Sequence, residues 1–163
     1  FHPPDEGTIA IGGRAVTHLP PHRRDTGMVF QSYALWPHLT IAEQVRMVAE
    51  AAPNRLPEEL IREFGDRLGI STLWNRFPGD LSGGESRRAA LIRTLAAIPA
   101  LLLLDEPFAH LDEDSQHLVA AVIRDWHTAT GATLLIVSHE SALLPSSFRL
   151  RLDAGRIEPK ANV

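Results

Sequence analysis

The sequence predicts an α/β fold in which a mostly parallel sheet packs against helices. Short strand-like segments alternate along the chain with longer segments of helical spacing. Two of the strand-like segments, residues 101–104 and 132–137, are apolar apart from Thr133, which is typical of strands buried on both faces. Parallel strands need crossover connections, and the helical segments between them supply these connections.

The first predicted strands are short. Residues 8–11 form an apolar, β-branched run that ends in a double glycine, which indicates a strand followed by a turn. A double proline at residues 20–21 interrupts the chain before a second strand at residues 26–30. These segments are expected to belong to the sheet-forming part of the chain.

The middle of the chain is predicted to be helical. Apolar residues recur at helical spacing in residues 41–51, and a second helix spans residues 57–69, between a proline suited to a first helical position and a glycine suited to a helix end. We therefore expect residues 39–98 to form an all-helical subdomain, and residues 1–38 and 99–163 to form the core around the sheet.

The remaining elements follow from their end signals. Ser82 opens a helix that runs towards Ile98, and residues 112–130 form a helix closed by Gly131. The tail at residues 148–157 alternates weakly between apolar and polar residues, which indicates a short hairpin.

The composition excludes several classes of function. The 163 residues carry a net charge of −4, which argues against a nucleic-acid partner, and they include no cysteine for disulfide or thiol chemistry. The sole lysine, Lys160, follows Pro159, so the chain has no phosphate-binding loop of the form G-x-x-x-x-G-K-[ST]. Because it also starts at Phe1, we expect a piece of a longer protein, or a processed or defective product.

Two adjacent carboxylates, Asp105 and Glu106, follow the leucine strand at residues 101–104. The carboxyl ends of parallel strands are where open α/β sheets bind their ligands. Asp105 is a candidate ligand for Mg²⁺, and Glu106 a candidate base that deprotonates or polarises a water. A plain exit from strand to loop, with both carboxylates in solvent, fits the residues equally well.

Ser82, Gly83, Gly84 and Glu85 stand at the start of a predicted helix. Free backbone N–H groups and the positive end of the helix dipole suit a bound phosphate there. Ser82 and Glu85 also have the S-x-x-E spacing of a capping box, and taken alone the segment favours this structural role. The double glycine is a feature that a cap does not require.

His139 and Gln31 each follow a predicted strand. His139 could donate a hydrogen bond to a phosphate oxygen, although a lone histidine is more often a surface or capping residue. Gln31 could ligate Mg²⁺ or orient a water, and taken alone it indicates nothing.

Together these residues occur in an order and spacing that resemble an ATP-binding-cassette (ABC) ATPase. The resemblance covers residues 5–157. The segment GMVFQSYALWPHLTIAEQV resembles the family's glutamine loop, and LSGGESRRAALIRTL resembles its signature helix. The segment ALLLLDEP resembles the Walker B strand, FAHLDE the D-loop, and LLIVSHE the histidine switch.

The resemblance implies a P-loop NTPase-like core with an all-helical ABC subdomain, incomplete at its amino terminus, that works with ATP and Mg²⁺. In this family two cassettes dimerise head to tail around ATP. The resemblance implies that Glu106 is the catalytic base, that His139 binds the γ-phosphate and that Gln31 senses Mg²⁺ and the γ-phosphate. It also implies that Asp105 supports Mg²⁺ and that Asp112 belongs to the D-loop. The residues implied to contact a nucleotide held by the partner cassette are Ser82, Gly83, Gly84 and Glu85.

The stretch FQSYALWPH resembles bacterial importers of polyamines, iron, sulfate, molybdate or phosphonates. It implies an ATPase subunit at the cytoplasmic face of the inner membrane, whose residues from Tyr33 to His38 face a permease; core packing of these aromatics is an equal alternative. A second hypothesis is a truncated, non-catalytic cassette that binds a partner subunit but no nucleotide of its own. Two departures from the family are Glu85, in place of the commoner glutamine, and the Ala109-His110 pair before Leu111.

Overall fold

The computed structural model describes residues 4–30, 32–109, 111–139, 143–144, 148–153 and 155–160. Gln31, the predicted sensor of Mg²⁺, lies outside the described residues, as does His110 of the predicted D-loop.

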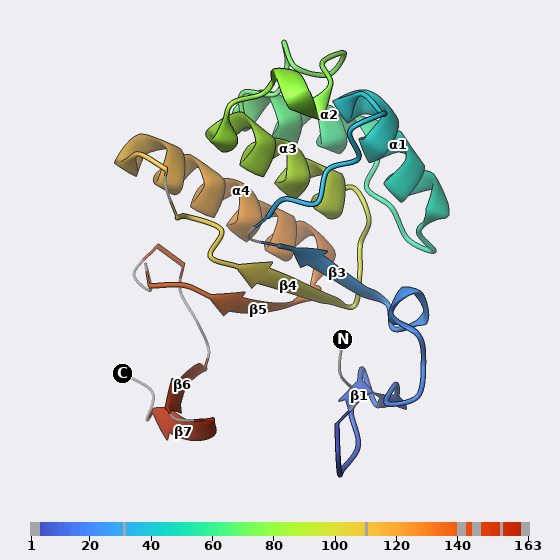
Figure 1. Cartoon of the computed structure of the whole chain (residues 1–163), viewed down its shortest axis with the longest axis vertical. Helices are drawn as coiled ribbons and strands as arrows, with labels where there is room; N and C mark the ends of the chain where they lie inside the picture. The colour runs from blue at the N-terminus through green and yellow to red at the C-terminus, as the bar shows by residue number, and fades with distance from the viewer. Residues whose placement is uncertain are drawn as a thin grey trace.

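The central sheet has three parallel strands in the order β3-β4-β5 (Figure 1). They are β3 (Thr26–Val29), β4 (Leu101–Asp105) and β5 (Thr133–Val137). Their register pairs Met28 with Leu103, and Leu103 with Leu135. Both pairings are parallel, so the predicted α/β class with a parallel sheet is confirmed. Long helical connections join each strand to the next, as parallel pairing requires.

In the described part of the chain, four α-helices form the connections: α1 (Ile41–Ala51), α2 (Glu58–Arg67), α3 (Gly83–Leu95) and α4 (Glu113–Thr130). Two short 3₁₀ helices occupy Pro21–Arg23 and Pro78–Asp80. The predicted bounds of α1 are confirmed, and α4 ends at Gly131 in the left-handed conformation that glycine favours. α3 ends three residues before the expected Ile98, where the chain turns towards β4.

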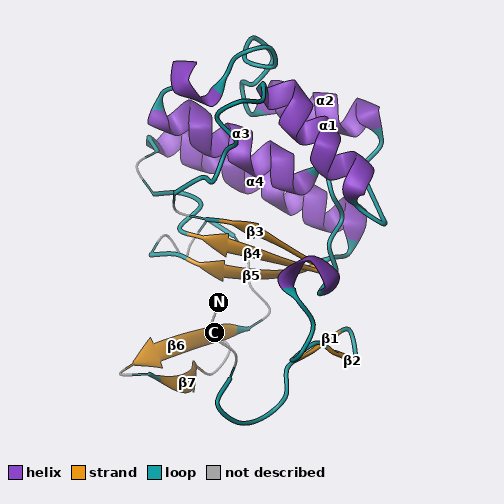
Figure 2. Ribbon diagram, turned by 45° about the vertical axis from the view of Figure 1, so that its right-hand side comes forward, coloured by secondary structure: helices purple, strands orange, loops and turns teal. Residues whose placement is uncertain are grey.

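All four helices lie on one side of the central sheet (Figure 2). The core between the two layers contains Trp126 of α4 and Leu102 and Leu104 of β4, all of them buried. The indole Nε1–H of Trp126 donates a hydrogen bond of 2.9 Å to the carbonyl oxygen of Leu95. One aromatic side chain thus joins α4 to the end of α3.

The opposite face of the sheet corrects one expectation. Leu102 and Leu104 are buried against the helices, but Leu101 and Leu103 are only half-buried, and Val137 of β5 keeps 58% of its surface exposed. The prediction that these strands are buried on both faces is therefore wrong for the chain as described. Uniform apolarity indicates that a strand tolerates burial, whereas burial itself depends on which helices cover each face.

Two antiparallel hairpins are separate from the central sheet. The first pairs β1 (Ala10–Ile11) with β2 (Arg14–Ala15), and the second pairs β6 (Arg149–Asp153) with β7 (Arg156–Lys160). The double glycine turns the first hairpin, with φ of +55° and +77° at Gly12 and Gly13. The sequence predicted this turn and the second hairpin, but not the short strand β2.

Candidate functional site

The candidate site is built around the loop that follows β4. Glu106 lies immediately after this strand and has a φ of +48°. Its N–H donates to the carbonyl oxygen of Val137 at 2.8 Å, and its own carbonyl oxygen accepts from the N–H of Ala109 at 3.2 Å. A positive φ at a non-glycine residue costs of order 1 kcal/mol, so these bonds hold a conformation that the residue would otherwise avoid.

His139 and Glu106 meet at the carboxyl edge of the sheet. The Nε2 atom of His139 lies 3.5 Å from the Oε1 atom of Glu106, at the ends of neighbouring parallel strands. The Glu106 side chain is only 18% exposed, whereas that of His139 is 96% exposed. The Glu106 side chain is therefore largely enclosed by the protein, whereas the His139 imidazole is open to a ligand or partner.

A capping box starts α3. The Ser82 hydroxyl accepts a hydrogen bond from the N–H of Glu85 at 3.3 Å, and the Glu85 carboxylate accepts from the N–H of Ser82 at 2.7 Å. Hydrogen bonding to the Glu85 carboxylate from the Ser82 side chain, and then from the Ser82 N–H, holds the pKa of Glu85 below its usual range. The structural role that the sequence favoured for this segment is confirmed.

The packing of this chain does not require glycine at positions 83 and 84, at the start of α3. A Cβ at Gly83 would meet only the Tyr33 hydroxyl at 3.9 Å, and one at Gly84 would meet Arg88 at 3.5 Å and Leu111 at 3.8 Å. These are ordinary van der Waals distances, and neither glycine has a positive φ. Neither the fold nor the cap therefore explains both glycines.

Removal of this cap is expected to weaken the fold in a pH-dependent way. Ser82→Ala should lower the free energy of unfolding by about 1 kcal/mol at neutral pH, measured by urea denaturation. Because folding lowers the pKa of Glu85, the carboxylate stabilises the fold above its unfolded pKa, and this contribution is lost as the pH falls through the folded pKa. The difference between the two proteins should therefore shrink in acid.

Thr40→Ala is the matched control for that experiment, because Thr40 and Glu43 form the same capping box at the start of α1. It should show the same loss and the same acid dependence. An unchanged stability of Ser82→Ala beside a weakened Thr40→Ala would contradict the cap at α3.

Asp112 caps α4. Its carboxylate accepts hydrogen bonds from the N–H of Ser115 at 2.9 Å and from the Ser115 hydroxyl at 2.7 Å, and these bonds lower its pKa. The side chain that the sequence assigns to the D-loop therefore has a structural role within this chain. Its role towards a second cassette stays a prediction.

Asp105 has the chemistry of a magnesium ligand. It ends β4, it is half-buried, and no described residue forms a hydrogen bond or ion pair with its carboxylate. A carboxylate oxygen is a ligand that Mg²⁺ prefers. Within the described part of the chain, no group of three or more histidine or acidic side chains is close enough together to hold a metal ion.

Two buried arginines of α3 were not predicted from the sequence. Arg87 donates hydrogen bonds to the carbonyl oxygens of Glu106 and Ala109, and Arg93 donates to those of Tyr33 and Ala34. Both arginines are more than nine-tenths buried, and burial lowers the pKa of Arg93. Sequence patterns place arginine on the surface, and no local signal announces carbonyl partners that lie far along the chain.

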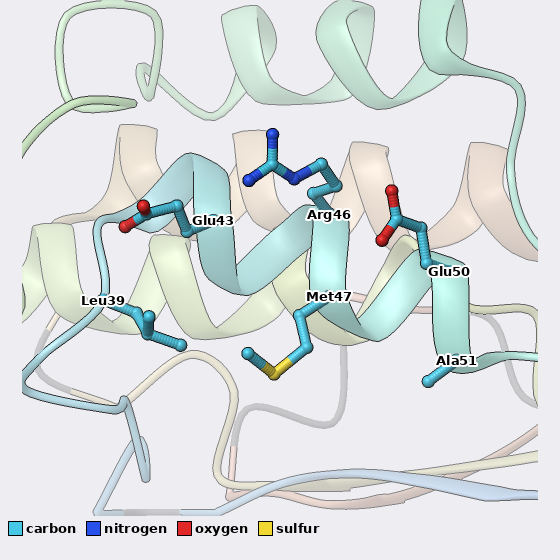
Figure 3. A pocket seen from close by; sticks show the side chains of 6 residues that line it. All are labelled: Leu39, Glu43, Arg46, Met47, Glu50 and Ala51. Atoms are coloured by element: carbon cyan, nitrogen blue, oxygen red, sulfur yellow. The ribbon is translucent and has the colours of Figure 1, made fainter.

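A hollow runs along the outer side of α1 (Figure 3). Glu43, Arg46 and Glu50 form a charged row on its wall, beside the side chains of Leu39, Met47 and Ala51. It contains none of the predicted catalytic residues.

Within the described residues, no helix combines the length and apolarity needed to cross a bilayer.

Comparison with known proteins gives one consistent family. The ABC transporter family matches residues 1–109. The sulfate/thiosulfate import ATP-binding protein CysA of Mycobacterium tuberculosis is 41% identical over 161 residues, which are 95% of this chain and 45% of that protein. The spermidine/putrescine import ATP-binding protein PotA of Acidothermus cellulolyticus is 40% identical over 97% of this chain and 42% of that protein.

The fold gives the same result. The dimeric bacterial ABC transporter cassette MJ0796 superposes with a TM-score of 0.73 and 25% identity, over 87% of this chain and 66% of that chain. The present chain thus spans less than half the length of the two curated relatives. The chain belongs to the ABC transporter family.

Proposed function

We propose that this chain is part of the ATP-hydrolysing subunit of a bacterial ABC importer, which couples ATP hydrolysis to solute uptake through a permease. The observation that carries the proposal is the contact of Glu106 with His139 at the carboxyl edge of the sheet, 3.5 Å apart. The import functions in the names of the relatives support the direction of transport.

Glu106 is the proposed catalytic base. Its partly enclosed carboxylate would accept the proton of a water that attacks the γ-phosphate. His139, exposed and open to a ligand, would donate a hydrogen bond to the oxygens of that phosphate. Asp105 and Gln31 would hold Mg²⁺, which when bound offsets the negative charge of the phosphates.

The start of α3 is the proposed contact to a nucleotide held by a second cassette. Ser82, Gly83, Gly84 and Glu85 would face that nucleotide in a head-to-tail dimer, and Asp112 would contact the partner cassette. The unexplained glycines support this contact, because a residue without a Cβ lets a phosphate approach the backbone N–H groups. The dimeric state named for the MJ0796 cassette supports a pair of subunits.

The segment from Tyr33 to His38 is the proposed contact to a permease, which places the subunit at the cytoplasmic face of the inner membrane. Trp36 and His38 are exposed, and the Trp36 ring packs 4.9 Å from the guanidinium of Arg93. An aromatic side chain that packs on a guanidinium and is also exposed to solvent suits a contact with another protein. Residues 39–98 would form the helical subdomain, and contacts between α1 and α3 support this division.

The proposal is tested in a chimaera that adds a phosphate-binding segment from the Mycobacterium tuberculosis relative ahead of Phe1. The chimaera should hydrolyse ATP, and His139→Ala should lower the rate by about 100-fold, because the γ-phosphate loses one hydrogen-bond donor. Steady-state release of inorganic phosphate measures this effect.

His117→Ala is the control for this prediction, since His117 is exposed on α4 and its Nε2 lies 3.9 Å from Glu113. It should leave the rate of hydrolysis unchanged. A His139→Ala chimaera that hydrolyses ATP at the full rate would remove the basis of the proposed site.

A further inference from the structure

Arg87 contacts two segments that are far apart along the chain. Its Nη1 donates to the carbonyl oxygen of Glu106 at 2.8 Å and also to that of Ala109. Its Nη2 lies 3.5 Å from the Tyr33 hydroxyl, and its Cζ lies 5.3 Å from the centroid of the Tyr33 ring. The residue is 4% exposed, so these contacts are shielded from water.

The first of these segments is the strained turn at Glu106. Glu106 has a φ of +48°, and its carbonyl oxygen accepts a hydrogen bond from Arg87 of α3 at 2.8 Å. A bond from a charged donor is stronger than a neutral one, and here it fixes the backbone that carries the carboxylate. Arg87 therefore helps to determine where the Glu106 carboxylate lies, without contacting the carboxylate itself.

The second segment is a strained turn at Tyr33 and Ala34, which have φ of +63° and +46°. Arg93 holds this turn by donating to the carbonyl oxygens of Tyr33 at 3.2 Å and Ala34 at 2.6 Å. Arg87 packs against the Tyr33 ring of the same turn. Two arginines of one helix thus hold two strained turns, and Arg87 touches both.

We propose that Arg87 is a positioning residue that ties the backbone of Glu106 to the turn at Tyr33 and Ala34. A movement of the Tyr33 ring would then change the packing of the guanidinium and, through it, the hydrogen bonds to the Glu106 and Ala109 carbonyls. The meaning of this link for catalysis rests on the proposed function, in which Glu106 is the base and Tyr33 belongs to the permease-facing segment.

Amide hydrogen exchange of the 163-residue chain tests the link without ATP. In Arg87→Ala, the amide of Ala109, which bonds to the Glu106 carbonyl, should exchange about tenfold faster, and so should the amides of Tyr33 and Ala34. Arg87→Lys should protect Ala109 and fail to protect Tyr33, since an ammonium group can reach carbonyls but does not stack as a planar guanidinium does.

Tyr33→Leu is the decisive variant, because it changes one turn and the measurement is made at the other. It removes the ring and hydroxyl that Arg87 contacts, and the amide of Ala109 should exchange several-fold faster. Arg93→Ala should loosen Tyr33 and Ala34 directly, and it should raise the exchange of Ala109 by a smaller factor, because the link passes through the Tyr33 ring. Unchanged exchange of Ala109 in Tyr33→Leu, or in Arg87→Ala, would overturn the proposal.

Two controls separate the link from a general loss of stability. Amides of α4 around Trp126 serve as the internal reference, and the effect at Ala109 is taken relative to them. Arg88→Ala removes the same charge from the next position of α3, and the buried Nε of Arg88 has no hydrogen-bond partner among the described residues. It should change neither turn; loosening of both turns by Arg88→Ala would show a helix effect and refute the role of Arg87.

Discussion

Glu106→Gln is expected to lower the rate of ATP hydrolysis by the chimaera at least about 100-fold while leaving ATP binding intact. Glutamine has nearly the same shape as glutamate and keeps the backbone of the strained turn, so the hydrogen bonds of the Glu106 N–H and carbonyl survive. The amide cannot accept the proton of the attacking water. Single-turnover hydrolysis and equilibrium binding of labelled ATP measure the two quantities separately.

Glu113→Gln is the control for this substitution, because Glu113 is an exposed residue in the first turn of α4. It should leave both hydrolysis and binding unchanged. If Glu106→Gln hydrolysed ATP at the normal rate, the proton would have to go to another group and Glu106 would lose the role of base.

Trp126→Ala is expected to destabilise the fold by about 3–5 kcal/mol, well beyond the loss of either helix cap. The side chain of Trp126 in α4 is fully buried in the core, so its truncation leaves a large cavity. It also leaves the carbonyl oxygen of Leu95 without the indole donor. Urea denaturation, followed by far-UV circular dichroism, measures the loss.

Trp126→Phe and Leu118→Ala divide this effect into its causes. Phenylalanine fills most of the cavity but donates no hydrogen bond, so it should cost less than alanine. Leu118 lies on the same helix with 39% of its surface exposed, and its truncation should change stability by less than about 0.5 kcal/mol. A loss below about 1 kcal/mol in Trp126→Ala would contradict the packing of α4 against α3.

Helix boundaries could be predicted where the sequence carries its own end signals. Ser82 and Glu85 have the spacing of a capping box, and α3 begins directly after Ser82. Gly131 supplies the left-handed residue that ends α4. The strand β2 has two residues and no pattern long enough to detect, and the end of α3 depends on how the chain turns into β4 rather than on a local residue.

Part of the candidate site was predictable for a different reason. Glu106 and His139 each follow an apolar strand, and neighbouring parallel strands bring their carboxyl ends to one edge of the sheet. Arg87 and Arg93 were not predictable, since their partners are backbone carbonyls between 19 and 60 residues away. Such contacts depend on the packed backbone and leave no spacing pattern in the sequence.

The one-sided helical layer also gives the four leucines of β4 two different tolerances to substitution. Leu102 and Leu104 fit into a packed interior, so a side chain at these positions has to match its neighbours in shape as well as in hydrophobicity. Leu101 and Leu103 lie on the face that the described helices leave open, where shape is not matched to a neighbouring helix. Substitutions at Leu101 or Leu103 should therefore disturb the packed helical layer less than substitutions at Leu102 or Leu104.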